Sequence, residues 1–112
     1  MEIEVLGTKY KIEYRKREDD KNLEQCDGYM DSSIKVIVVE EKEWEPMDKL
    51  DLKQYRKKVT RHEIVHAFLH ESGLDGSSMS TNGAWATNEE MVDWFAIQSP
   101  KMFKAFEEAG CL

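Results

Sequence analysis

Cysteine is scarce in this 112-residue chain, which contains only Cys26 and Cys111. The two lie far apart in sequence and have no metal-ligand spacing to each other, so neither a disulfide framework nor a cysteine-ligated zinc site is expected. The N-terminus, MEIEVLGTKYKIEYRK, also lacks the basic flank and apolar run of a secretory signal. We therefore expect free thiols and a cytoplasmic location.

Long apolar runs and an excess of basic charge are missing too. No segment approaches the roughly twenty apolar residues that a membrane span needs, and 16 basic against 23 acidic residues give a net charge of −7. Such a charge repels the phosphates of nucleic acids, so we expect neither a membrane nor a nucleic-acid partner. One cluster of basic residues lies in a predicted helix and is interpreted as its solvated face; it comprises Lys53, Arg56, Lys57, Lys58 and Arg61.

The first half of the chain has the patterns of β-strands. Residues 2–15 alternate around the turn-prone Gly7, and residues 28–31 are separated from residues 33–40 by a short turn, so each region predicts a β-hairpin. The last of these strands is apolar on both faces, which predicts that something packs or binds on both sides of it. Between the hairpins, residues 15–25 predict an exposed loop or a short polar helix.

The second half of the chain is helical. Apolar residues with helical spacing predict a long helix over residues 48–72, with Pro46 near its start and Gly73 after its end. Residues 74–86 are rich in Gly, Ser, Asn and Thr and predict a loop.

The C-terminal region predicts one or two further helices. Thr87 and Glu90 have the spacing of a capping box at the start of the first, and Ser99 and Pro100 are expected to interrupt it before a last short helix. Strands followed by helices indicate one α+β domain over residues 1–112, with antiparallel hairpins packed on the long helix.

All three histidines lie in the segment RHEIVHAFLHESG, which begins at Arg61 in the predicted long helix. His62 and His66 are four residues apart, so their imidazoles leave the same helix face and can bind one ion. Glu63 lies beside them and completes the HExxH pattern, in which two histidines bind zinc and the glutamate is the general base toward metal-bound water. His70 is excluded as a third ligand because it lies roughly 12 Å from His62 along the helix axis.

The second predicted helix offers the missing ligand in the segment NEEMVD, residues 88–93. Glu89 and Asp93 share a helix face, so Glu89 can enter the metal sphere while Asp93 hydrogen-bonds a ligand imidazole from behind. Glu90 is the rival ligand, and its expected capping role favours Glu89.

HEIVH together with NEEMVD resembles the gluzincin branch of the zincin metallopeptidases, in which a second helix bears a ligand Glu and an Asp four residues later. By position, the resemblance implies these site residues: the Zn²⁺ ligands His62, His66 and Glu89, the catalytic base Glu63, and Asp93 behind a ligand imidazole. The short chain, its strand-rich first half and the VDWFA after the ligand Glu resemble the ImmA/IrrE-like families of bacteria and their prophages.

The resemblance implies a minimal zincin-like zinc metalloendopeptidase that acts on a cytoplasmic protein or peptide, such as a regulator in a phage setting. The strand at residues 34–39 is expected to lie beside the cleft with an edge open to an extended peptide. The loop that holds Trp85 is expected to be a lid, or its Trp a core anchor. Tyr29, Tyr55 and His70 are candidates for stabilising the oxyanion of the transition state.

Two other interpretations of the same residues are a non-catalytic module and a metal-free helix. In the first, zinc ties the two helices together, protein fills the fourth metal position, and an exposed surface binds a partner protein. In the second, the histidines bind nothing and Glu63 pairs in solvent with Arg61 or Lys57.

Overall fold

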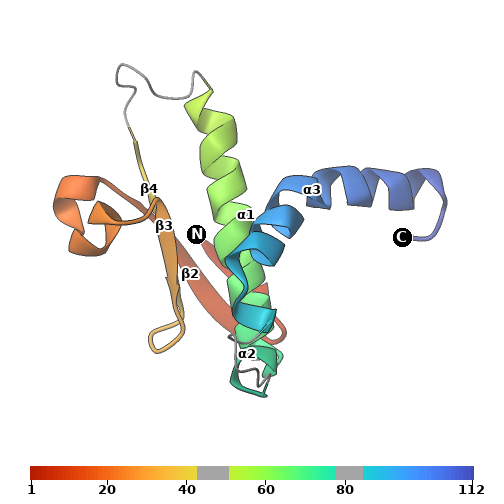
Figure 1. The fold of residues 1–112 in the computed structure, drawn as a ribbon, viewed down its shortest axis with the longest axis horizontal. Coiled ribbons are helices and arrows are strands. Elements are labelled where there is room, and N and C mark those ends of the chain that lie inside the picture. The colour runs from red at the N-terminus through yellow and green to blue at the C-terminus, as the bar shows by residue number, and fades with distance from the viewer. Residues whose placement is uncertain (43–50, 78–84) are drawn as a thin grey trace.

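A computed structural model of the protein describes residues 1–42, 51–77 and 85–112. Its elements, in chain order, are β1 (Glu2–Val5), β2 (Thr8–Arg15), the 3₁₀ turns η1 (Arg17–Asp19) and η2 (Lys21–Glu24), β3 (Gly28–Asp31), β4 (Val36–Glu40), α1 (Leu52–Glu71), α2 (Leu74–Ser77), the 3₁₀ turn η3 (Trp85–Thr87) and α3 (Glu89–Glu108). The predicted α+β class is confirmed, with α1 lying across one side of the sheet (Figure 1).

Two regions for which loops were considered contain short helical elements in the structure. The charged stretch between the hairpins forms η1 and η2, so of the two alternatives it is the short helical one. The predicted loop after Gly73 begins with α2 and ends in η3, and its middle lies outside the described residues, as does Pro46.

Both predicted hairpins form, but they join in an unexpected way. β1 pairs with β2 and β3 pairs with β4, in each case antiparallel, whereas β2 and β4 are parallel, giving the order β1-β2-β4-β3. The sheet is therefore mixed rather than purely antiparallel. Since β4 is paired on both sides, the expectation that it offers an open edge is wrong, and β3 is the edge strand on that side.

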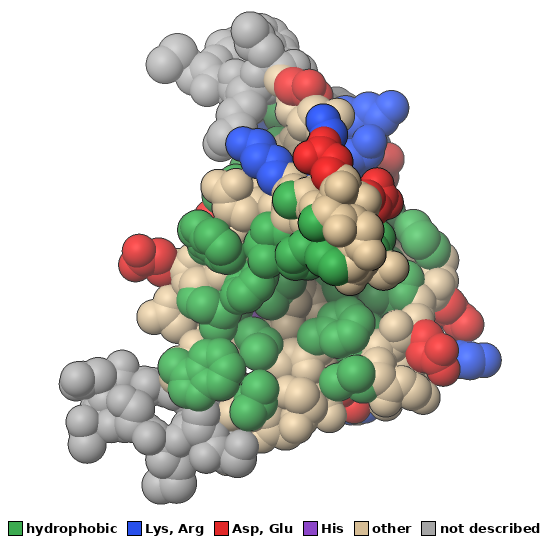
Figure 2. All heavy atoms as spheres, turned by 90° about the vertical axis from the view of Figure 1, so that its right-hand side faces the viewer, with side chains coloured by type: hydrophobic (Ala, Val, Ile, Leu, Met, Phe, Trp, Pro, Cys, Tyr) green, Lys and Arg blue, Asp and Glu red, His purple; other side chains and the backbone are tan. Residues whose placement is uncertain are grey.

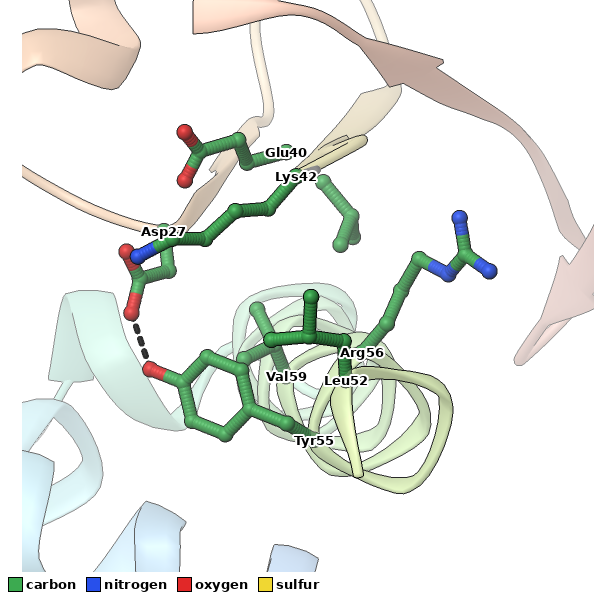
Figure 3. Close-up of a pocket in the computed structure, with 8 residues that line it drawn as sticks. Asp27, Glu40, Lys42, Leu52, Tyr55, Arg56 and Val59 are labelled. Carbon is green, nitrogen blue, oxygen red and sulfur yellow. Dashed lines mark hydrogen bonds between the residues drawn. The ribbon is translucent and has the colours of Figure 1, made fainter. Parts of the chain in front are cut away.

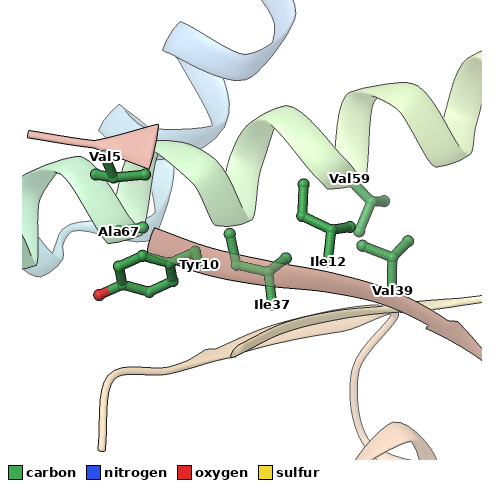
Figure 4. Packing of buried hydrophobic residues seen from close by; sticks show 7 residues of the cluster. All are labelled: Val5, Tyr10, Ile12, Ile37, Val39, Val59 and Ala67. Carbon is green, nitrogen blue, oxygen red and sulfur yellow. The ribbon is translucent and has the colours of Figure 1, made fainter. Parts of the chain in front are cut away.

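The core lies between the sheet and α1 (Figure 4). Its buried apolar side chains are Val5, Tyr10, Ile12, Ile37, Val39, Val59 and Ala67. Val38, on the opposite face of β4, is also 0% exposed, which confirms that this strand is packed on both sides. Burial of apolar area stabilises a fold by about 25 cal/mol per Å². This packing therefore holds α1 against the sheet and positions the HExxH segment.

α1 has the caps that its ends require. The Asp51 side chain accepts a hydrogen bond from the backbone N–H of Gln54 (3.0 Å), and Gly73 follows the helix with a φ of 82°, in the left-handed region that glycine adopts without strain. The buried residues of α1 are Val59, Glu63 and Ala67. Their four-residue spacing forms one stripe facing the sheet, and a glutamate occupies its middle.

The predicted break at Ser99 and Pro100 is wrong, because α3 continues through both residues to Glu108. A proline inside a helix has no N–H to donate, so the carbonyl four residues earlier loses its partner. Here that carbonyl belongs to Ala96, and the Arg61 guanidinium of α1 donates to it instead. A contact from another helix thus compensates for the missing helical hydrogen bond.

The C-terminal part of α3 projects away from the sheet (Figure 1). It leaves several large apolar side chains of α3 exposed, namely Trp94, Phe95, Ile97, Phe103 and Phe106. Viewed from that side, hydrophobic side chains gather on the surface (Figure 2). Within the described parts of the chain, no helix has both the length and the apolar character to cross a membrane.

Candidate metal centre

The structure brings His62 and His66 of α1 together with Glu89 of α3. The Nε2 atoms of the two histidines are 3.1 Å apart, and each lies 2.9 Å from a different carboxylate oxygen of Glu89. Glu89 stands in the first turn of α3, after the cap Asn88, whose side chain accepts a hydrogen bond from the backbone N–H of Met91 (2.8 Å). Within the described residues, this is the one group of three or more possible ligands close enough to share an ion.

These residues fit a zinc ion in chemistry and in size. Two histidines and one carboxylate are a donor set that zinc sites use, and ligand atoms about 2.1 Å from a tetrahedral zinc lie roughly 3.4 Å from one another. The two histidine nitrogens, and each nitrogen with its own oxygen of Glu89, are a few tenths of an ångström closer than this, and one ligand atom from each of the three residues lies within 4.8 Å of the others. A small outward movement of the three side chains would therefore accommodate the ion.

Asp93 fixes the orientation of the His62 ring. Its Oδ1 lies 3.1 Å from Nδ1 of His62, and because an ionised carboxylate only accepts, Nδ1 must carry the hydrogen. In the neutral form of His62 this leaves the lone pair of Nε2 facing the oxygens of Glu89, so acceptors converge on one point where a cation can bind them together. Partial burial acts to raise the pKa of Asp93, but hydrogen bonds from Lys58 and His62 outweigh it and hold the pKa below its usual range.

Burial also changes the titration of the second histidine. It lowers the pKa of His66, although the neighbouring Glu89 carboxylate opposes the change. A neutral imidazole at ordinary pH is the form that binds a metal ion. His66 is therefore ready to act as a ligand.

Glu63 is a buried carboxylate to which the described residues offer no hydrogen bond. It is only 6% exposed, and among the residues that the structure describes no hydrogen bond or ion pair reaches it. Burial raises its pKa to about 7, an effect that the negative charge of Glu89 adds to and that His62 partly offsets. The interpretation in which Glu63 pairs in solvent with Arg61 or Lys57 is therefore wrong.

At Gly28, β3 lies close against α1 next to this carboxylate. A Cβ at Gly28 would lie 2.9 Å from Cγ1 of Val59 and 3.4 Å from Cγ of Glu63. Any side chain at this position would push the strand away from the helix. Gly28 thus permits the edge strand to form one wall of the site.

Two open hollows, of about 180 and 500 Å³, flank the centre. Cys26, Gly28, Glu63 and Glu89 line both of them, so the hollows are the two sides of one cleft between β3 and the helices. A third, smaller cavity of about 40 Å³ lies behind the first, at the N-terminal end of α1, where Tyr55 hydrogen-bonds Asp27 (Figure 3).

Each candidate for oxyanion stabilisation is bound to a carboxylate. The hydroxyl of Tyr29 donates to Asp20 (2.6 Å), that of Tyr55 donates to Asp27, and Nδ1 of His70 lies 2.8 Å from Asp75. Tyr55 lines the smaller side of the cleft and Tyr29 the larger. His70 lies outside the ligand group, as its spacing predicted.

Other details of the prediction were wrong or incomplete. Asn88, not Thr87, caps α3, so the expected capping role of Glu90 is wrong. Glu89, which the spacing and the resemblance also favoured, is the residue that meets the histidines. Trp85 is 55% exposed and is no core anchor. The two cysteines are free, as predicted.

Sequence reasoning also missed Lys58, because the basic cluster that contains it is typical of a solvated helix face. Its Nζ lies 3.1 Å from Oδ1 of Asp93, the same oxygen that His62 approaches. Arg61, from the same basic cluster, reaches the carbonyl of Ala96. The spacing could have indicated Lys58. Lys58 lies four residues before His62, and Glu89 lies four residues before Asp93, so each pair shares one face of its helix.

Comparison of the chain with protein-family models, with curated proteins and with solved structures finds no match.

Proposed function

We propose that the protein is a zinc-dependent metallopeptidase of zincin type, with His62, His66 and Glu89 as ligands. The observation that carries the proposal is Glu63, a buried carboxylate that has no partner among the described residues and lies next to three converging candidate ligands. Leaving a buried acid unpaired has a free-energy cost of about 1–3 kcal/mol or more. A role as general base at this position accounts for that cost.

In this proposal the metal supplies the Lewis acid that polarises the scissile carbonyl and acidifies a water. Glu63 takes a proton from that water and later delivers it to the leaving amine. Its pKa of about 7 in the metal-free protein suits a group that must both accept and release a proton near neutral pH. Asp93 holds His62 in the tautomer that binds the ion.

The expected substrate is an extended segment of a protein. β3 has an unpaired edge beside the cleft, since its only strand neighbour in the described sheet is β4, and Gly28 brings that strand up to Glu63. A peptide can add to such an edge through main-chain hydrogen bonds. We propose a cytoplasmic protein as the substrate, in keeping with the resemblance to ImmA/IrrE-like families of prophages.

A non-catalytic zinc would need a fourth protein ligand. The described part of the chain places three candidate ligands around the point, not four. A fourth position left to water or substrate is the arrangement of catalytic zinc sites.

Metal content and peptide cleavage together test the proposal. Elemental mass spectrometry of protein purified without a His tag is expected to find about one zinc per chain, and none in a His66→Ala variant. The zinc-loaded protein is then incubated with a peptide library whose cleavage is followed by mass spectrometry. Cleavage that a chelator stops and zinc restores supports a peptidase, whereas one tightly bound zinc without any cleavage would overturn it.

A further inference from the structure

Lys58 and His62 approach one oxygen of Asp93 from the same side. Nζ of Lys58 and Nδ1 of His62 each lie 3.1 Å from Oδ1 of Asp93. The geometry follows from two pairs at four-residue spacing, Lys58 and His62 on α1 and Glu89 and Asp93 on α3, which interleave where the helices cross. Acidic and basic side chains therefore alternate along the contact, from Glu89 through His62 and Asp93 to Lys58.

Lys58 also contacts the aromatic ring of Tyr55. Its Nζ lies 5.2 Å from the centroid of the Tyr55 ring, a distance suited to a cation–π interaction. The hydroxyl of Tyr55 is bound in turn to Asp27, at the start of β3 (Figure 3). The lysine side chain is 27% exposed, so its position beside Asp93 is supported on two sides.

We infer that Lys58 is a positioning residue that shares the Asp93 carboxylate with His62 and thereby weakens zinc binding at the centre, an inference that rests on the proposed zinc site. An imidazole hydrogen-bonded to a carboxylate is a more basic ligand. Lys58 withdraws part of that carboxylate's charge, and its own positive charge repels a divalent cation. Less donation from the ligand leaves the ion a stronger Lewis acid.

The direction in which zinc affinity changes when Lys58 is removed distinguishes this role from a merely structural one. If Lys58 only kept Asp93 in place, its loss would free the carboxylate and weaken zinc binding, as loss of Asp93 itself does. If Lys58 shares the charge, its removal tightens zinc binding. Lys58→Met tests this directly, because methionine keeps an apolar stem against the Tyr55 ring and removes the charge together with its hydrogen bond to Asp93.

The measurement is the zinc dissociation constant, obtained by competition with a chromophoric chelator. We expect Lys58→Met to bind zinc roughly three- to tenfold more tightly than the unaltered chain, and Asp93→Asn to bind it about tenfold or more weakly. In the Asp93→Asn background, most of the effect of Lys58→Met is expected to disappear, since the shared carboxylate is gone. Lys57→Met, at the exposed neighbouring position, controls for the loss of one positive charge and is expected to change the constant less than twofold.

Cobalt substitution adds a readout of geometry. The visible absorption of bound Co²⁺ is expected to keep the shape of a four-coordinate site in Lys58→Met, because the three ligands stay in place. Lys58→Gln is measured alongside, with circular dichroism of both metal-free variants, so that a folding defect in one does not decide the result.

The outcomes are distinct from those that test the peptidase. Zinc affinity that is unchanged or lower in both Lys58 variants, with normal binding by the unaltered chain, would overturn the inference and leave the proposed function standing. Failure of the unaltered chain to bind zinc would overturn the metal centre and this inference with it.

Discussion

Glu63 and Glu71 are two glutamates of one helix, eight residues apart, in opposite surroundings. Glu71 accepts hydrogen bonds from Thr8 (3.1 Å), Tyr10 (2.7 Å) and Lys35 (2.7 Å), and these contacts, that with Lys35 foremost, lower its pKa to about 2. Glu63 has no such donor among the described residues, and burial raises its pKa to about 7. The same residue type therefore serves as an anchor at the end of α1 and is available for proton transfer at its middle.

The difference shows how a structural carboxylate is distinguished from a chemical one. A carboxylate that only stabilises a fold is satisfied by donors, as Glu71 is. A carboxylate left unsatisfied in the interior reduces stability, so its presence beside three converging ligands calls for a functional explanation. Four predictions test this contrast.

The largest expected effect is on catalysis. Glu63→Gln is expected to lower peptide cleavage by the zinc-loaded protein by about 10²–10⁴-fold, since the amide cannot take up the proton. Zinc content should stay near that of the unaltered protein, because Glu63 is not a ligand. Glu71→Gln is the matched variant and is expected to retain cleavage within a few-fold. Equal losses in the two variants would mean that Glu63 has no special role.

Zinc is expected to stabilise the fold by joining α1 to α3. At a free zinc concentration a thousandfold above the dissociation constant, the free energy of unfolding should rise by about 4 kcal/mol. Thermal unfolding with zinc and with a chelator measures the difference. Glu71→Gln should keep the full increment, and His66→Ala should lose it; an increment that survives in His66→Ala would place zinc elsewhere.

The third prediction concerns the stability of the metal-free protein against pH. Because the pKa of Glu63 is about 7 in the fold and about 4.3 in an unfolded chain, ionisation favours the unfolded state. The contribution of the Glu63 side chain to the free energy of unfolding is therefore fully present below about pH 4 and is lost as the pH rises through 7.

Glu63→Gln removes this loss. At pH 8 the metal-free variant should be more stable than the unaltered protein by up to about 4 kcal/mol, and near pH 4 the two should be alike. Denaturant unfolding across this pH range makes the comparison, with Glu90→Gln as an exposed control. A variant that is less stable at pH 8 would show that the carboxylate has a stabilising partner.

The smallest effect is expected at the anchor, where the sign is reversed. Tyr10→Phe removes one donor to Glu71 and should lower the free energy of unfolding by about 1–2 kcal/mol at pH 7. Because the pKa of Glu71 is lowered to about 2, its stabilising contribution is present above about pH 4.3 and is lost as the pH falls toward 2.

The deficit of Tyr10→Phe should therefore shrink as the solution is acidified. Denaturant unfolding at pH 7, 4 and 2.5 follows the trend, with Tyr14→Phe, whose hydroxyl meets Thr60 at 3.4 Å, as the control. A deficit that is constant with pH would show that the tyrosine hydroxyl acts independently of the Glu71 charge.

Much of the architecture followed from local patterns. Alternation predicted both hairpins, helical spacing predicted α1, and Gly73 marked its end. The four-residue spacings that place His62 with His66 and Glu89 with Asp93 are also local, so spacing together with the resemblance to gluzincins was enough to select the residues of the centre. Their roles as ligands and base remain predictions for the experiments above.

Contacts between distant segments determined the rest. The parallel pairing of β2 with β4, which makes β3 the edge beside the site, joins residues that neither strand's own pattern could relate. Pro100 is tolerated inside α3 because Arg61, 35 residues before Ala96, bonds the carbonyl that proline leaves free. Lys58 belongs to the centre because α3 lays Asp93 beside it.

The difference between Glu63 and Glu71 has the same origin. Periodicity within a helix specifies which side chains share a face, since that depends only on the helical repeat. Whether a carboxylate on that face meets three donors or none depends on which strand packs against it, because donors such as Tyr10 and Lys35 come from distant parts of the chain. The HExxH spacing could therefore be recognised in the amino acids, whereas the lack of a partner for its glutamate among the described residues is a property of the folded chain.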